Sequence, residues 1–173
     1  MQQFLALTCS FIFMLANPAY SQATRYENQA IRCSGIYWVL TGVRQSNPDL
    51  GSYFTQIEIA YSGLYADERQ KRGLKTTNGD IRITRDTVLK ELVGEFRSKE
   101  ESVKREINLC LLWTNKMRQA GGISAYSEVF PNEARTESMG PLLDIAFLTF
   151  TEWVKSGART TTDTVDQIRR GSE

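Results

Sequence analysis

The stretch LGSYFTQIEIAYSGL, residues 50 to 64, carries the clearest structural signal in this sequence. Its apolar side chains recur mostly at steps of three and four residues: Leu50, Tyr53, Phe54, Ile57, Tyr61 and Leu64. This spacing puts them on one stripe of an α-helix over about four turns. Gly51 and Gly63 each weaken such a helix by up to about 1 kcal/mol relative to alanine. We therefore expect both glycines to allow close packing against a neighbouring element.

The residues before this stretch predict another helix, over 26–44. Its apolar side chains also recur at helical spacing and cover much of the helix surface: Ala30, Cys33, Ile36, Tyr37, Leu40 and Val43. The sequence SNPD, residues 46–49, separates the two helices, because Ser46 or Asn47 can cap a helix and Pro48 suits its first position.

Turn and capping signals divide the middle of the chain. Asn78-Gly79 is a strong turn signal, so we expect a loop or a short hairpin around it. Thr84 is expected to cap a third helix. The capping-box pattern SKEE at 98–101 predicts a break near Ser98 and a fourth helix, which ends at the glycine pair 121–122. One continuous helix over 84–119 is the alternative.

A long polar loop is expected over 120–140, before a last helix that begins at Pro141 and ends at Gly157. This helix, with the sequence PLLDIAFLTFTEWVKSG, is apolar on most of its surface. We expect it to be the buried central helix, and a docking face for a partner is the alternative. The predicted fold is thus all-α: a single-domain bundle of four or five helices over 24–157, with a polar, mobile tail over 158–173.

The first 23 residues indicate export. They contain no charged side chain, residues 4–16 are almost continuously apolar, and Pro18 is followed by the small residues Ala19, Ser21 and Ala23. This pattern is typical of a secretory signal peptide that is cleaved after Ser21 or Ala23. We therefore expect a periplasmic or extracellular protein, and no later stretch is long enough to span a membrane.

The predicted export indicates a role for the cysteines. Cys9 leaves with the signal peptide, so the mature chain keeps only Cys33 and Cys110. Two cysteines in an exported chain most often form one disulfide, which here would pin the first helix to the fourth. Two buried free thiols or a redox-active pair are the alternatives, although redox pairs are usually spaced as Cys-x-x-Cys.

Few residues suggest catalysis. The chain has no histidine, which excludes Ser-His and Cys-His nucleophiles and removes the commonest transition-metal ligand. We predict no cofactor and no metal site, and the net charge of +1 argues against nucleic-acid binding. Glu58, between Ile57 and Ile59, is the first candidate for a general acid if the protein is an enzyme. The alternative is that it lies at the edge of the apolar stripe and reaches water.

Aromatic residues supply candidates for binding. Trp38 and Tyr65 lie slightly off the main apolar stripes and can border a groove, and Phe150 and Trp153 mark the last helix. The alternative is that all four side chains fill the core of the bundle.

In outline the chain resembles small exported helical proteins of bacteria, on the signal peptide and the cysteine segments AIRCSGIYWVL and INLCLLWTNKM. Periplasmic immunity proteins that block cell-wall amidases of rival bacteria belong to that group, although none of their inhibitory motifs matches here residue by residue. We expect a non-enzymatic protein that binds another exported protein, such as an inhibitor or immunity protein. The alternatives are a small acid-residue hydrolase of cell-wall or polysaccharide substrates, and a carrier of a small apolar ligand.

Overall fold

The computed structural model describes residues 23–131, 137–160 and 163 of the chain. Within them the fold is all-helical, as predicted, and the elements in chain order are α1 Arg25–Leu40, the 3-10 helix η1 Thr41–Gln45, α2 Pro48–Lys71, α3 Asn78–Ser98, α4 Glu100–Gln119, the 3-10 helix η2 Ile123–Ala125 and α5 Pro141–Lys155. The predicted signal peptide lies outside the described residues, except for Ala23. No described helix is both long and apolar enough to cross a membrane.

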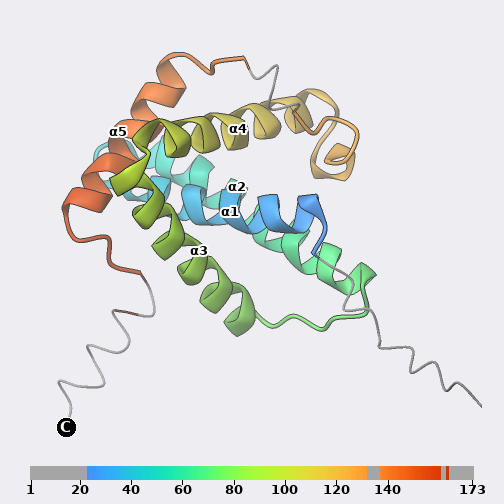
Figure 1. Cartoon of the computed structure of the whole chain (residues 1–173). Coiled ribbons are helices and arrows are strands. Elements are labelled where there is room, and N and C mark those ends of the chain that lie inside the picture. The colour runs from blue at the N-terminus through green and yellow to red at the C-terminus, as the bar shows by residue number, and fades with distance from the viewer. Residues whose placement is uncertain (1–22, 132–136, 161–162, 164–173) are drawn as a thin grey trace, which may run out of the picture.

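α1 lies at the centre of the bundle and contacts each of the other four α-helices. Figure 1 shows α1 between α4 and α3, with α2 behind it. Side chains on several sides of α1 are therefore fully buried, among them Ala30, Cys33, Ile36 and Leu40. This confirms the prediction that the first helix is buried on much of its surface.

The last helix is not the central one, and that expectation is wrong. α5 packs on α1 and α4 through Leu143, Ala146 and Phe150, which are buried. Ile145 and Leu148 point away from the bundle and are 44% and 59% exposed. The apolar composition of α5 thus reflects one face in the core and a second face open to solvent.

The segment around Asn78-Gly79 is neither a hairpin nor a loop but the first turn of α3. Thr77 caps this helix: its hydroxyl accepts from the Asp80 backbone N–H, and the Asp80 carboxylate accepts from the Thr77 backbone N–H at 2.8 Å. This reciprocal capping box satisfies backbone groups that a turn would leave to solvent. Thr84 is therefore inside α3, where its hydroxyl donates to the Asp80 carbonyl, and does not begin the helix.

The predicted break near Ser98 is confirmed, but its cause is different. α3 ends at Ser98 and α4 begins at Glu100, with Lys99 between them in a non-helical conformation, at φ −149° and ψ 65°. Ser98 does not cap α4, because its hydroxyl donates back to the carbonyls of Gly94 and Glu95.

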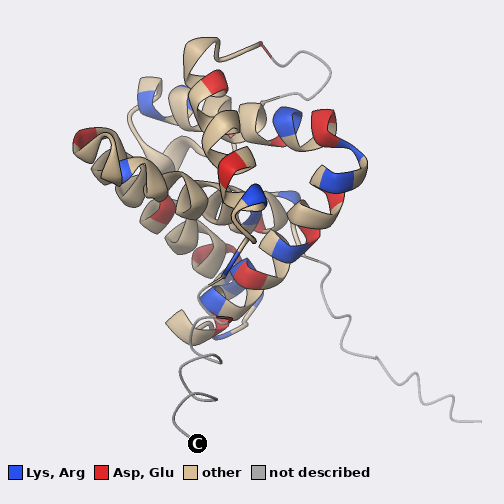
Figure 2. Cartoon of the chain, turned by 90° about the vertical axis from the view of Figure 1, so that its left-hand side faces the viewer, with Lys and Arg blue, Asp and Glu red and all other residues tan. Residues whose placement is uncertain are grey.

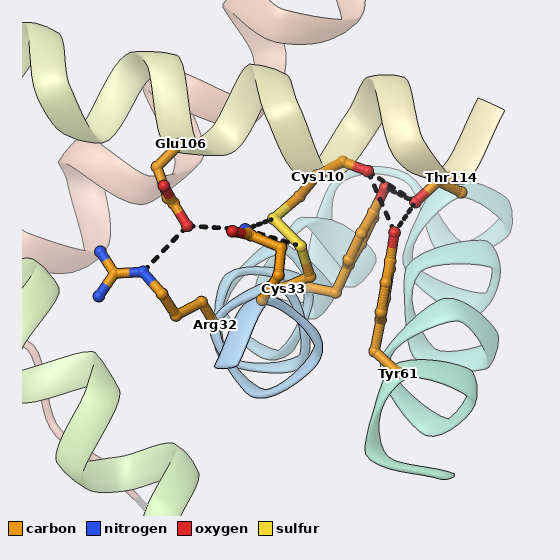
Figure 3. Close-up of a disulfide and its surroundings, with 8 residues drawn as sticks. Arg32, Cys33, Tyr61, Glu106, Cys110 and Thr114 are labelled. Atoms are coloured by element: carbon orange, nitrogen blue, oxygen red, sulfur yellow. Dashed lines mark hydrogen bonds and ion pairs between the residues drawn. A yellow bond between two sulfur atoms is a disulfide. The ribbon is translucent and has the colours of Figure 1, made fainter. Parts of the chain in front are cut away.

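Cys33 of α1 and Cys110 of α4 lie at disulfide distance, as predicted, with sulfur atoms 2.07 Å apart and Cα atoms 5.4 Å apart. Both side chains are fully buried. Figure 3 shows the sulfur bridge between the two helices, with Arg32 and Glu106 on one side and Tyr61 and Thr114 on the other.

Part of the predicted mobile tail is described. Thr160 is buried, and the Lys90 ammonium of α3 lies 3.3 Å from the Asp163 carboxylate. Residues 161–162 and 164–173 of the tail lie outside the described residues.

Candidate protein-binding surface

Buried hydroxyls reinforce the junction of α1, α2 and α4. The Tyr37 hydroxyl lies 2.7 Å and the Tyr61 hydroxyl 3.1 Å from the Thr114 hydroxyl, which in turn donates to the Cys110 carbonyl. Burial raises the pKa of both phenols. These polar atoms are hydrogen-bonded inside the core, as Figure 3 shows, so they hold the helices together and leave no open site there.

Glu58, the candidate general acid, lies on α2 beside an arginine of α3. Its Oε1 atom is 2.8 Å from Arg85 Nη1 and accepts hydrogen bonds from Ser62 at 2.9 Å and Ser34 at 3.2 Å. Three donors therefore surround this oxygen, in place of the apolar setting that the general-acid hypothesis assumed. The Arg85 guanidinium also lies 5.3 Å from the ring of Trp38, which makes it a link between α1, α2 and α3.

The four aromatic binding candidates lie mostly inside the bundle. Phe150 is fully buried and Tyr65 is 3% exposed, so neither offers a surface to a partner in this fold. Trp38 and Trp153 are half-buried and meet edge to face at 6.4 Å between ring centroids. The structure thus joins two of the four candidates at the contact between α1 and α5 and places the other two in the core.

Glu27 and Glu68 are among the buried carboxylates that were not singled out from the sequence. Glu27 on α1 is 3% exposed and pairs with Arg72 at 2.5 Å, and Glu68 on α2 is also 3% exposed. Glu68 accepts hydrogen bonds from Thr24 and Lys71, each at 2.7 Å, and from the Tyr126 hydroxyl. In the sequence both look like ordinary charged positions of amphipathic helices, because most of their partners, such as Arg72 for Glu27 and Thr24 and Tyr126 for Glu68, come from distant segments.

Glu68 gives the protein an expected sensitivity to acid. Burial alone would raise the pKa of Glu68, but the hydrogen bonds from Lys71, Tyr126 and Thr24 lower it below its ordinary value of 4.5. Since the folded pKa is the lower one, the stabilisation is fully present above pH 4.5 and is lost as the pH falls through the folded value. Urea unfolding between pH 7 and pH 3 should show this loss.

The same titration tests whether the acid sensitivity comes from Glu68. Glu68→Gln should be less stable than the wild type at pH 7 and should lose less stability on acidification. Glu101→Gln, at an exposed position of α4, is the matched control and should follow the wild type. An unchanged acid profile in Glu68→Gln would contradict the assignment.

The exposed face of α2 carries two grooves. One, the α2–α3 groove, has a volume of about 670 Å³ and is lined by Glu58, Ile59, Ser62, Ile81, Arg82 and Arg85, among others. The other, the α2–η2 groove, has about 750 Å³ and includes Ala60, Leu64, Asp67, Ile123 and Tyr126. Gly63 lines both grooves, so it marks the crest of α2 between them. Ile59, one turn away on this crest, is 63% exposed.

The two glycines of the opening stretch have different surroundings. A Cβ atom on Gly51 would lie 2.4 Å from Arg44 Cβ and 2.6 Å from Arg44 Cα, so this glycine does allow close packing, against η1. A Cβ atom on Gly63 would meet nothing within 4 Å. The expected neighbour of Gly63 is therefore absent from the described residues of the chain.

Comparisons with protein-family models, curated proteins and solved structures found no match to this chain. Among the described residues, no group of three or more Cys, Asp or Glu side chains could hold a metal ion.

Proposed function

We propose that this is an exported, non-enzymatic protein that acts by binding another exported protein through the exposed face of α2. The apparent signal peptide, and two cysteines at disulfide distance, support the exported location. The grooves on both sides of α2 and the exposed Ile59 support binding, because together they offer a partner two hollows and an apolar contact on one face.

The observation that carries the proposal is that Gly63 is open and lies between the two grooves, whereas Gly94 is equally open but lines neither. A glycine in a helix interior weakens the helix by up to about 1 kcal/mol relative to alanine. Packing of Gly51 against Arg44 offsets this loss, whereas Gly63 has no such contact with any described residue. Close approach of a partner's backbone to the crest of α2 would explain why a glycine stands there.

Site-specific photo-cross-linking tests the proposal. A photoreactive amino acid at Ile59 should capture one exported protein in intact cells, and Gly63→Leu should reduce the captured amount by about tenfold or more, because the new side chain fills the contact. Gly94→Leu is the matched control: Gly94 is also an exposed helix glycine with nothing within 4 Å, but it lines neither groove.

Both leucine variants should be at least as stable as the wild type, since leucine is the better helix former. A loss of capture in Gly63→Leu therefore cannot come from unfolding. Equal capture by the two variants would argue against the α2 face as the binding surface.

A second candidate function is an acid-residue hydrolase, because Glu58 lies in the α2–α3 groove together with Ser62 and Arg85. Glu58→Gln keeps the shape and the acceptor oxygen but removes the charge. If the protein hydrolyses cell-wall or polysaccharide substrates through this residue, the variant should lose all turnover. If it is a binding protein without hydrolase activity, no turnover should be found in the wild type.

A carrier of small apolar ligands has less support. An apolar hollow lies between Tyr53, Ile57, Met117 and Ile123 and has a volume of about 220 Å³. Pockets for small ligands usually have about 300–1,000 Å³.

A further inference from the structure

The charges beside the crest of α2 differ on its two sides. Arg82 is exposed and lines the α2–α3 groove, and Asp67 is exposed and lines the α2–η2 groove. Neither makes an ion pair or a hydrogen bond within the described part of the chain. The other charges of the grooves are compensated: Glu58 pairs with Arg85 at 2.8 Å, and Lys71 with Glu68 at 2.7 Å. One uncompensated charge of each sign is left, on opposite sides of Gly63.

The two uncompensated charges, Arg82 and Asp67, are a local feature of the surface. Figure 2 shows basic and acidic residues interleaved along the helices, with no face of a single sign in that view. The charged residues that line the two grooves are likewise of both signs, so a partner recognised by general attraction to a basic or acidic patch does not fit this surface. A partner that matches one positive and one negative position fits it, because each charge would find an opposite one.

The shape of the surface favours a helix as the contacting element. α2 forms a ridge with a groove on each side, and neighbouring rows of side chains on a second helix can enter both grooves when the helices cross. Gly63 at the crest lets the two backbones approach closely. An added β-strand would need an exposed sheet edge, and the described residues contain no strand.

We infer that the partner supplies an α-helix that crosses α2 at Gly63, with an acidic side chain facing Arg82 and a basic side chain facing Asp67. This inference rests on the proposed function and adds the chemistry of the partner's contact.

A displayed library of amphipathic helical peptides, selected on the full mature chain, tests the inference. Binders of the α2 face are those that Gly63→Leu abolishes and Gly94→Leu does not. These binders should carry an acidic residue at one edge of the contact and a basic residue at the other. Arg82→Glu should weaken them at least about tenfold, and exchanging their acidic residue for lysine should restore binding to that variant.

Arg97→Glu serves as the matched control for charge, because Arg97 is an exposed arginine of α3 that lines neither groove, and it should leave affinity unchanged. The inference is overturned if no Gly63-dependent helical binder emerges, or if such binders ignore both Arg82→Glu and Asp67→Lys. It is also overturned if sedimentation shows that the purified chain dimerises and that Gly63→Leu abolishes the dimer, since a second copy then occupies the surface.

The result that would contradict the proposed function is different from the result that would contradict the helix inference. If the cross-linker at Ile59 captures an exported protein through a segment that is not helical, the protein-binding function stands and only the helix inference is lost. If helical peptides bind as expected but no exported protein is captured in cells, the surface chemistry stands and the proposed function is lost.

Discussion

Replacing both cysteines, as Cys33→Ala and Cys110→Ala, is expected to lower the free energy of unfolding by about 4 kcal/mol. The two residues are separated by 77 positions, so the cross-link removes much of the conformational freedom of the unfolded chain. Alanine is chosen because both sites are fully buried, where a serine hydroxyl would need a hydrogen-bond partner. Urea unfolding of the mature protein, under non-reducing conditions, measures the difference.

A reductant provides the control for this experiment. It should bring the wild type close to the stability of the double variant and should leave the double variant unchanged. A wild type that is insensitive to reductant, with thiols that react with an alkylating agent after unfolding, would show that no disulfide forms between Cys33 and Cys110. Cys33 and Cys110 would then have to be explained as buried free thiols.

The helices that were predicted well are those with a strong local signal. The stripe from Leu50 to Leu64 lies inside α2, and Asn47 and Pro48 begin this helix as expected, because the Asn47 side chain accepts from the Leu50 backbone N–H at 3.0 Å. The pairing of Cys33 with Cys110 followed from the predicted export, which would remove Cys9 and leave only these two cysteines. In each case a few residues that lie close in sequence, or a very small number of possible pairs, decided the outcome.

Two competing local signals explain the error at the start of α3. Asn78-Gly79 favours a turn, but Thr77 and Asp80 form a capping box three residues apart in the same segment. The helix continues for 21 residues, so its packing stabilises the capped arrangement over a short hairpin. The pattern Thr-x-x-Asp was the signal that could have revealed it.

The candidate binding surface on α2 could not be predicted from the sequence alone. Gly51 and Gly63 occur in the same stripe, and only the position of Arg44 distinguishes the glycine that packs from the one that is open. The same is true of Glu68, since its partners Thr24 and Tyr126 are 44 and 58 residues away. Such features follow from how the helices pack, which periodicity alone does not determine.

Phe150→Ala is expected to destabilise the protein by about 3–5 kcal/mol. Phe150 is fully buried, and its ring centroid lies 5.5 Å from that of Trp153 and 6.0 Å from that of Phe96. Removing the ring leaves a cavity between α5 and the rest of the bundle, which neighbouring aromatic rings can fill only in part. Urea unfolding of the variant and the wild type measures this loss, and a change within about 0.5 kcal/mol would contradict the buried position.

Leu148→Ala, two residues earlier on the open face of α5, is the matched control. Leu148 is 59% exposed, so its removal should change the stability by no more than about 0.5 kcal/mol. Capture of a partner at Ile59 should also be unaffected, because the proposed binding surface lies on α2. If Leu148→Ala abolished capture while the protein stayed folded, the exposed face of α5 would be part of the binding surface, and the assignment of that surface to α2 alone would be wrong.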